Sequence, residues 1–361
     1  MARSDGTASA PITVRALTDG KATIDGQGVR KTVDLQRSWW IVEGIVARNG
    51  TDNVFRVDGS NNVLRRVSAY DASNSLNSSV IMFLGNNNLL EDAIVAGRGR
   101  YAAEIYKGSG NTIRRVFAMW EGWDGQSWCS TAWPNGNSIG VYNASGATVE
   151  NAIAYGRSLR GFLVQANSNT AIAKDNAVLG SIAVLQGRNY DGSVWDYGSY
   201  PNRPGPTSCT SVLDLNDGGD RIGFALFGQG TLSGNVFRDV LAVENVGLGF
   251  DMHRPYTSGT VSGNLLERAT LIGNGAILAP YERSQGGNIY LGMAGLDVRD
   301  SRIQNAPAQI AQGQGARLQM YVNRQATGES MTPWPMNARA LSELGVDIDA
   351  IIQKYAQEAT R

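Results

Sequence analysis

A short pattern recurs along the chain and constrains its fold more than any other feature. The segments NNVLRRVSAYDAS (61–73), NNLLEDAIVAGRG (87–99) and GNTIRRVFAMWEG (110–122) each place an Asn turn before an apolar residue, two charged residues and a second apolar residue. A period of about 20 to 50 residues indicates a solenoid. With the apolar residue before the first charge as the anchor, the pattern recurs about every 23 residues or at longer intervals at Val42, Leu64, Leu90, Ile113, Val149, Ile172, Phe237, Leu266 and Val298.

The longest interval, between Ile172 and Phe237, predicts one further repeat anchored near Leu213. A second short strand is expected before each anchor, in segments such as SVIMFLG, AEIYKG, IGVYNA, GFLVQA and GFALFG, which alternate with the period of two that strands require. Short strands between Gly and Asn turns cannot bury a face alone, but stacked on one another they form a continuous core.

Helical solenoids are the main alternative, but their repeats need apolar residues at helical spacing and tolerate few glycines, whereas this chain has 44. The sequence therefore predicts an all-β fold, a parallel β-helix, over residues 1–330, with an N-terminal cap that is apparently missing. The tail, 331–361, has helical periodicity with Asn337 and Asp347 as N-caps, which predicts a short C-terminal helical segment that caps the solenoid.

The charged residues of the repeat are expected to form ladders on one outer face. In stacked coils the equivalent side chains lie about 4.8 Å apart, and the residue after the anchor alternates in sign over much of its column. This arrangement predicts ion pairs that fix the register of the coils and have no catalytic role. The column runs through Glu43, Arg65, Glu91, Arg114, Glu150, Arg238, Glu267 and Arg299.

Composition excludes some partners. The formal net charge is zero and 18% of residues are charged, so no basic field is available to bind a nucleic acid. No apolar run approaches the roughly 20 residues of a membrane span. The chain has two cysteines, Cys129 and Cys209, which either form a disulfide between two long loops or remain buried thiols.

Two long interruptions of the repeat are rich in aromatic residues. Loops on a rigid scaffold commonly carry function, and sugar rings stack their C–H faces on aromatic rings. These loops are therefore predicted either to line a polysaccharide groove or to fold over the coil as small satellite cores. The aromatic residues singled out are Trp120, Trp123, Trp128 and Trp133 in the first loop and Trp195 in the second.

Polar and aromatic residues on the strands before the anchors are expected to line up beside the first loop, with Glu104 on the same face. This row consists of Tyr106, Lys107, Tyr142, Asn143, Gln165 and Gln186.

Two further clusters are candidates for chemistry. GFDMHRPY brings together Asp251, His253 and Arg254, and the only histidine of the chain is either a hydrogen-bonded structural residue or a catalytic one. DLNDGGD gathers oxygen ligands suited to Ca²⁺ or forms an Asx-rich turn. The metal ligands it offers are Asp214, Asp217 and Asp220.

The segments PITVRALTDGKATIDGQGV and SWWIVEGIVARNG resemble right-handed parallel β-helix proteins of the pectate-lyase-like superfamily, and the similarity runs from about residue 11 to 305. The resemblance implies a protein outside the cell or at its surface that binds an extended polysaccharide. Relatives are polysaccharide lyases, glycoside hydrolases, phage tailspikes and surface proteins.

For a lyase, the resemblance implies β-elimination: a Ca²⁺ cofactor neutralises a uronate carboxylate and Arg or Lys removes the C5 proton. Lys107 or Arg254 is then the base, and Asp251, or Asp214 with Asp217, binds the metal ion. Hydrolysis would instead need two carboxylates about 5 to 9.5 Å apart, for which Glu104 with Glu121 or Asp124 is the nearest pair. A non-catalytic solenoid is the remaining alternative, in which an N-terminal module or a neighbouring subunit stacks on the open end of the coil.

Overall fold

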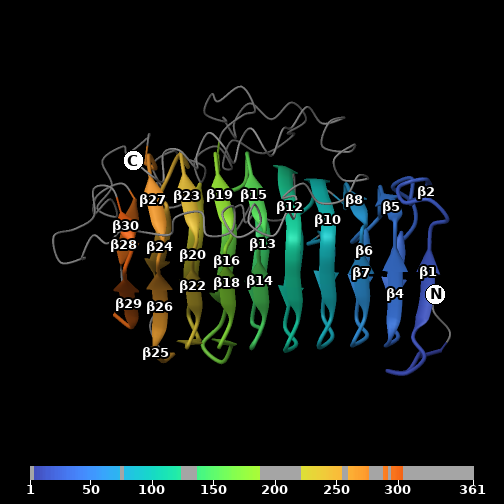
Figure 1. The fold of residues 1–361 in the computed structure, drawn as a ribbon, viewed down its shortest axis with the longest axis horizontal. Coiled ribbons are helices and arrows are strands. Elements are labelled where there is room, and N and C mark those ends of the chain that lie inside the picture. Colours follow the sequence, from blue (N-terminus) through green and yellow to red (C-terminus); the bar gives the residue numbers. More distant parts are fainter. Residues whose placement is uncertain are drawn as a thin grey trace, which may run out of the picture.

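The described residues form one solenoid whose coils are stacked along the long axis, with the strands side by side and each running across that axis (Figure 1). The computed structural model describes residues 4–73, 77–122, 136–187, 221–253, 259–275, 288–291 and 294–303, except for the side chains of His253 and Ile272. In these ranges the regular elements are β-strands, and the named strands pair in parallel. The chain is therefore an all-β right-handed parallel β-helix, as predicted. The predicted helical segment 331–361 lies outside the described residues.

Three sheets make up the solenoid. An 18-stranded sheet contains two rows joined by β10 (Leu89–Arg98) and β12 (Thr112–Gly122), which run through both. Its first row holds β1 (Ile12–Arg15), β4 (Trp40–Glu43), β7 (Val63–Arg65), β14 (Thr148–Glu150), β18 (Ala177–Leu179), β22 (Val236–Arg238), β26 (Asn264–Glu267) and β29 (Leu296–Arg299). Its second row holds β2 (Ala22–Asp25), β5 (Ile45–Arg48), β8 (Ser68–Tyr70), β15 (Ile153–Tyr155), β19 (Ile182–Val184), β23 (Leu241–Val243), β27 (Thr270–Ile272) and β30 (Arg302–Ile303).

A nine-stranded sheet closes each coil. It consists of β3 (Val33–Leu35), β6 (Phe55–Val57), β9 (Ser79–Phe83), β11 (Tyr101–Tyr106), β13 (Asn137–Tyr142), β16 (Arg160–Ala166), β20 (Ile222–Gly228), β24 (Phe250–His253) and β28 (Ile289–Leu291). A three-stranded sheet of β17 (Ile172–Lys174), β21 (Thr231–Ser233) and β25 (Val261–Ser262) lies on the way back to the first row. No helix that could cross a membrane occurs in the part of the chain that the structure describes.

The two rows of the 18-stranded sheet meet at a corner of one residue. This residue has a left-handed backbone in successive coils, with φ of 53° at Arg66, 52° at Arg115 and 50° at Arg268. The second charge of the repeated motif thus occupies the corner, where Arg115 pairs with Asp92 at 2.6 Å and Arg268 with Asp239 at 2.6 Å. Long side chains adopt this backbone at a cost, so the fold has to hold it in place.

The anchor residues stack in one column, with one correction. Val42, Leu64, Leu90, Ile113 and Val149 follow one another in register, as predicted. The next member is Val178, which pairs with Val149 on one side and Phe237 on the other. The anchor predicted at Ile172 is therefore wrong, since Ile172 lies in β17 and is half-exposed. The extra coil predicted near Leu213 is also wrong, because β18 and β22 pair directly.

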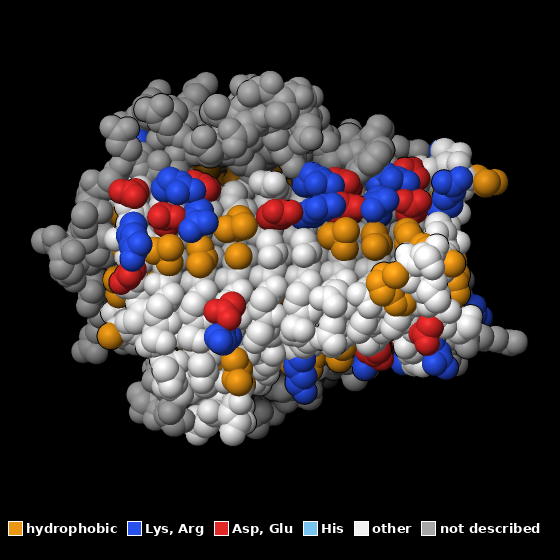
Figure 2. Space-filling model, turned by 60° about the horizontal axis from the view of Figure 1, so that its bottom comes forward, with side chains coloured by type: hydrophobic (Ala, Val, Ile, Leu, Met, Phe, Trp, Pro, Cys, Tyr) orange, Lys and Arg blue, Asp and Glu red, His pale blue; other side chains and the backbone are white. Residues whose placement is uncertain are grey.

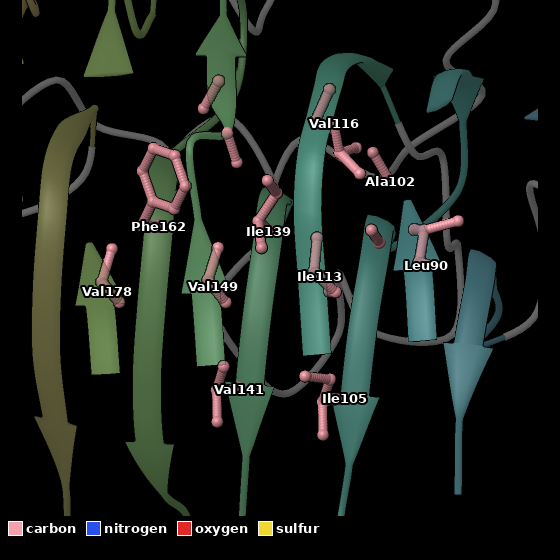
Figure 3. Close-up of a cluster of buried hydrophobic side chains, with 14 of the residues drawn as sticks. Leu90, Ala102, Ile105, Ile113, Val116, Ile139, Val141, Val149, Phe162 and Val178 are labelled. Carbon is pink, nitrogen blue, oxygen red and sulfur yellow. The ribbon is translucent and has the colours of Figure 1, made fainter. Parts of the chain in front are cut away.

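The core fills the space between the sheets (Figure 3). Ile105 and Val141 of the nine-stranded sheet and Ile113 and Val149 of the 18-stranded sheet belong to one buried cluster. Further along, aromatic rings take over: Phe162 and Phe224 stack with their centroids 4.8 Å apart, and Phe237 meets Phe250 edge-on at 5.1 Å. Each coil contributes only a few apolar side chains, so burial becomes extensive only when the coils stack.

Ladders of buried amide side chains join successive coils. Asn176 Nδ2 donates to Asn235 Oδ1 at 2.9 Å, and Asn235 Nδ2 donates to Asn264 Oδ1 at the same distance. Each Oδ1 also accepts a backbone N–H of the preceding Asn, so the ladder satisfies backbone groups at the turn. Asn62, Asn88 and Asn111 form the same kind of ladder in earlier coils, and Ala147, which occupies the equivalent position in the next coil, separates it from Asn176. A further ladder consists of Gln186, Asn245, Asn274 and Asn288.

The charged column forms as predicted and appears as a band of acidic and basic side chains along the solenoid (Figure 2). Glu91 is its most buried member at 3% exposure, and it pairs with Arg65 at 2.5 Å, Arg114 at 2.6 Å and Arg115 at 3.0 Å. Burial alone would raise the pKa of Glu91, but the hydrogen bonds and charges of Arg114 and Arg65 outweigh it and lower the pKa below its ordinary value.

Asn235→Ala tests the amide ladder. The substitution removes hydrogen bonds to Asn176 and Asn264 and leaves buried partners unsatisfied, so we expect the free energy of unfolding to fall by about 3 kcal/mol in denaturant titrations. The control is Asn86→Ala at an exposed turn, where the two bonds that Asn86 Oδ1 accepts from the N–H and the hydroxyl of Ser109 are lost and the fall stays below about 1 kcal/mol. Equal effects of the two substitutions would contradict a structural role for the ladder.

Glu91→Gln tests the charged column through its pH dependence. Ionised Glu91 stabilises the folded chain above about pH 4.5, and this contribution is lost as the pH falls through the lower folded-state pKa. We therefore expect the variant to be about 2 kcal/mol less stable at neutral pH and the difference from wild type to shrink below about pH 4.5. Thermal melts from about pH 3 to about pH 8 measure this difference in stability. A difference that does not change with pH would contradict the account.

Candidate functional site

Among the described residues, the outward side of the nine-stranded sheet brings together the group of ionisable and aromatic side chains that is best suited to bind and act on a ligand. In β11, Ala103 and Ile105 point into the core, which leaves Glu104 and Tyr106 on the outer side. Register then aligns equivalent residues of neighbouring strands. Tyr106, Tyr142, Gln165, Phe227 and His253 form one row, which we call the rim row.

The rim row starts with two tyrosines and a lysine. The rings of Tyr106 and Tyr142 lie with centroids 5.4 Å apart, and Lys107 Nζ lies 5.0 Å from the Tyr106 centroid. Lys107 and Asn143 occupy the same left-handed turn position in successive coils, with φ of 66° and 54°. The Lys107 side chain is exposed, so this end of the row is open to solvent.

Behind the rim row lies a buried group that we call the Arg100 cluster: Arg100, Tyr101, Glu104 and Tyr142. The Arg100 guanidinium lies 5.3 Å from the Tyr101 centroid and 5.7 Å from that of Tyr142, and it hydrogen-bonds to Tyr142. Its Nη1 also donates to Asn77 Oδ1 at 2.6 Å. A cation that lies within about 6 Å of two aromatic rings is attracted by both, which stabilises the guanidinium at this position.

Glu104 is a carboxyl group in an almost dry environment, with 3% of its surface exposed. Ser79 Oγ donates a hydrogen bond to it at 2.5 Å. Burial raises the pKa of Glu104, and this effect exceeds the opposing effects of the Arg100 charge and the Ser79 hydrogen bond. The carboxyl group therefore retains a proton to higher pH than an exposed Glu does.

The two tyrosines of the cluster retain their protons strongly. Burial raises the pKa of Tyr101 and of Tyr142, and it outweighs the opposing charge of Arg100. The Tyr101 hydroxyl is also buried without a hydrogen-bond partner among the described residues. A buried polar group in this situation is costly unless a ligand or another partner satisfies it.

A second guanidinium lies on the same face. Arg160 begins β16, is largely buried, and its guanidinium lies 5.5 Å from the Phe227 ring centroid. Its Nη1 approaches Asn137 Oδ1 at 3.5 Å. Register puts Arg160 two strands from Tyr101, or roughly 10 Å along the sheet. The outward side of the nine-stranded sheet thus carries Arg100, Arg160 and Lys107, together with the carboxyl group of Glu104.

The structure assembles only part of the predicted site. Tyr106, Lys107, Tyr142, Asn143 and Gln165 lie together as predicted. The outward position predicted for Gln186 is wrong, because its side chain is buried and donates to the Ala154 and Val184 carbonyls.

Asp251 does not join Lys107. It is buried in β24, in the same row as Glu104 but four strand spacings away, or roughly 19 Å. His253 lies two residues further on in β24, so Lys107 is remote from Asp251 and His253, whereas Arg254, predicted as the alternative base, lies outside the described residues.

The prediction that Trp120 binds substrate is wrong. The Trp120 side chain is only 1% exposed, and its Nε1 donates a hydrogen bond to the Gly99 carbonyl at 2.5 Å. Its ring packs against Gly136 so closely that any side chain at position 136 would collide with it. Glu121, proposed with Glu104 as a carboxylate pair, belongs to β12 of the other sheet. Several predicted residues lie outside the described residues: Trp123, Asp124, Trp128, Cys129, Trp133, Trp195, Cys209, Asp214, Asp217, Asp220 and Arg254.

Arg100, Tyr101, Arg160 and Ser79 are the members of the site that sequence reasoning missed. The segment GRGRYAAEIYKG carries a signal, because an Arg-Tyr pair opens a strand whose later residues alternate inward and outward. Arg160 opens its strand in the same way. The pattern alone does not separate these arginines from the arginines of the charged column.

Among the described residues no group of three His, Cys, Asp or Glu side chains is arranged to bind a metal ion. Asp251, the one predicted ligand that the structure describes, has Ala225 and Tyr290 as its register neighbours, so no second carboxylate stands beside it. The described residues therefore do not form the predicted Ca²⁺ site. The site at Asp214, Asp217 and Asp220 stays a prediction.

No protein-family model and no curated protein matches the chain. Solved structures similar to it include the pectate lyase Pel9A, with 14% identity, a TM-score of 0.41, and coverage of 84% of this chain and 64% of the lyase. The catalytic domain of a GH87 α-1,3-glucanase, in complex with tetrasaccharides, has 12% identity and a TM-score of 0.43, with 82% and 52% covered.

A rhamnogalacturonan lyase is also similar, with 15% identity, a TM-score of 0.39, and 81% of this chain and 70% of the lyase covered. The chain thus spans less than two thirds of the first two of these structures. At such identities the likeness concerns the fold alone.

Glu104→Gln tests whether the buried carboxyl group retains its proton. A raised folded-state pKa means that wild-type stability is fully present at low pH and declines as the pH rises above about 4.5, whereas the amide does not titrate. We expect the variant to match wild type near pH 4 and to gain relative stability toward pH 8, as measured by denaturant titration across about this range. A variant that is less stable at pH 8 than at pH 4, relative to wild type, would show instead an ionised Glu104 paired with Arg100.

Proposed function

We propose that this chain binds an extended acidic polysaccharide along the outward side of the nine-stranded sheet and cleaves it by β-elimination. The observation that carries the proposal is the Arg100 cluster, in which a guanidinium lies against the rings of two tyrosines beside the rim row. Acting on such a substrate would agree with the predicted location outside the cell or at its surface.

The rim row supplies the binding surface. A pyranose ring can stack its C–H face on Tyr106, while Gln165 and Asn143 offer amide groups to its hydroxyls. Equivalent residues recur at each strand, about 4.8 Å apart, so a chain running along the solenoid axis meets a new side chain at every coil. An elongated ligand fits this arrangement better than a compact one.

Positive charge selects the substrate class. Arg100, Arg160 and Lys107 all lie on this face, and a planar guanidinium binds a carboxylate with two parallel hydrogen bonds. Neutralisation of a uronate carboxylate makes the C5 proton more acidic, which is the difficult step of elimination. An acidic polysaccharide is therefore favoured over a neutral one at this site.

The remaining groups account for the proton movements. Lys107 takes the proton from C5, the C4–O4 bond breaks as the C4–C5 double bond forms, and Tyr142 donates a proton to the departing oxygen. Tyr142 suits this role because burial raises its pKa and keeps the phenol protonated at neutral pH. Glu104, whose pKa is raised by burial and which accepts a hydrogen bond from Ser79, helps to hold the cluster together.

Hydrolysis is less well supported by the described carboxylates. A pair about 5 to 9.5 Å apart is needed, whereas Glu104 and Asp251 are roughly 19 Å apart in their row. The Ca²⁺ cofactor predicted from the sequence is kept as a proposal for Asp214, Asp217 and Asp220, and the elimination above is written for the described residues only.

One observation favours a second candidate function, a structural solenoid that stacks on another module or subunit. Val14 stands in the anchor column above Val42, yet it is 43% exposed whereas Val42 is 3% exposed. Leu17 and Val29 of the same first coil are exposed as well. β1 pairs with a strand on one side only, so its other edge offers unpaired backbone groups to a partner coil.

Lys107→Asn tests the proposed chemistry without disturbing the backbone, because Asn143 already occupies the equivalent left-handed position one coil later. We expect kcat/KM for the best substrate among polygalacturonate, alginate and chondroitin sulfate to fall at least about 100-fold, with an unchanged melting temperature. The ultraviolet absorbance of the unsaturated uronate measures the rate, with and without Ca²⁺.

The matched control is Lys21→Asn, at an exposed lysine directly before β2, a strand of the 18-stranded sheet and not of the sheet that carries the rim row. It should cleave at the wild-type rate. Full activity of Lys107→Asn would remove Lys107 from the mechanism, and no absorbance rise from any of the three polymers would contradict the lyase function and favour the structural solenoid.

A further inference from the structure

We propose that the second corner of the first four coils forms a separate binding groove for neutral, hydroxyl-rich sugar units. By the second corner we mean the turn between the second row of the 18-stranded sheet and the nine-stranded sheet. The groove there has a volume of about 710 Å³, which falls within the range of about 300 to 1,000 Å³ typical of sites for small ligands.

The repeat builds this groove from equivalent positions. Asn49 and Asp71 stand at the same place in successive coils, each in a left-handed backbone with φ of 55° and 56°, and Gln27 in the first coil, one residue beyond the aligned position, has a φ of 56°. This left-handed backbone ends β2, β5 and β8 at similar positions. The turns that follow these strands therefore lie on the same side of the solenoid. The side chains that line the groove and carry hydrogen-bonding groups are Asp25, Asn49, Thr51, Asp71, Ser73 and Arg98.

Every charge described in the groove has an opposite charge beside it. Asp25 Oδ2 pairs with Arg48 at 2.9 Å, and Asp71 Oδ1 pairs with Arg98 at 3.5 Å. A hydrogen bond from Asn49, then one from the Gln27 backbone N–H, lower the pKa of Asp25 and keep it ionised as an acceptor. The arginines remain about half exposed, so their other N–H groups are available as donors.

This balance points to the ligand class. A phosphate or uronate would need excess positive charge, and a free cation would need carboxylates without arginine partners. An apolar ligand would need a largely hydrophobic lining, whereas the lining here is mostly polar side chains and backbone. Ion-paired carboxylates, amides and hydroxyls in alternation offer both acceptors and donors, which suits the hydroxyl groups of a neutral sugar.

The groove is distinct from the Arg100 cluster. Its lining comes from coils before β11, and it includes neither Lys107 nor a member of the rim row. Binding there does not depend on cleavage, so the inference holds whether or not the proposed elimination is correct. A chain with both sites could hold one glycan segment by its hydroxyls while a charged segment reaches the nine-stranded sheet.

Isothermal titration calorimetry with cellohexaose, xylohexaose and mannohexaose tests the groove on the full chain. We expect at least one of these probes to bind, and Thr51→Trp, which fills the groove, to weaken that binding at least tenfold. Asp71→Asn keeps the left-handed backbone, since Asn49 occupies the same position one coil earlier, and it removes an ionised acceptor. It should weaken binding about tenfold, and it carries the test if Thr51→Trp fails to fold.

Two controls separate this site from others. Thr148→Trp makes the same substitution in β14, away from the groove, and Lys107→Asn alters the proposed cleavage site; both should bind the probe as wild type does. The proposal is overturned if none of the three neutral probes binds, if Thr51→Trp and Thr148→Trp bind equally well, or if Lys107→Asn abolishes binding. Loss of polyuronate cleavage in Lys107→Asn with intact probe binding supports both sites independently.

Discussion

The stacking of buried amide side chains from one coil to the next is the interaction on which the rest of this structure depends. Most strands of the 18-stranded sheet are only three or four residues long, so no coil buries an adequate core alone. Ladders such as Asn176, Asn235 and Asn264 satisfy backbone groups at the turns and fix each coil directly over the one before it. Register then follows for every outward row, including the charged column and the rim row.

Much of the fold could be predicted from the sequence, because equivalent residues recur at each coil. Prediction failed at Ile172, where an apolar residue followed by Ala and Lys imitates the anchor and its charges. The deciding signal was an Asn two residues before the anchor: Asn176 precedes Val178 as Asn88 precedes Leu90. In the sequence these asparagines are typical turn residues. Their buried ladder consists of contacts between coils, which sequence spacing alone does not reveal.

The candidate site could be predicted only in part, for a related reason. Tyr106 and Tyr142 were recognised because strand register aligns them. Trp120 could not be classified, since an aromatic residue next to a long loop can either bind a ligand or fill the corner beneath the loop, and Trp120 fills the corner. Arg100 was missed because its partners, Asn77 and Tyr142, come from two other coils, and sequence spacing does not reveal contacts between coils.

The outward side of the nine-stranded sheet is the proposed binding surface for an anionic glycan, and the register of the stacked coils determines the positions of its side chains. Burial raises the pKa of the two tyrosines and of Glu104 on that surface, while three basic side chains supply the charge that selects an acidic ligand. The most direct measurement is a crystal structure with a bound tetragalacturonate. We predict a uronate carboxylate within hydrogen-bond distance of Arg100 or Arg160 and a sugar ring on Tyr106; an oligosaccharide seated on the 18-stranded sheet, with the Arg100 cluster untouched, would contradict the account.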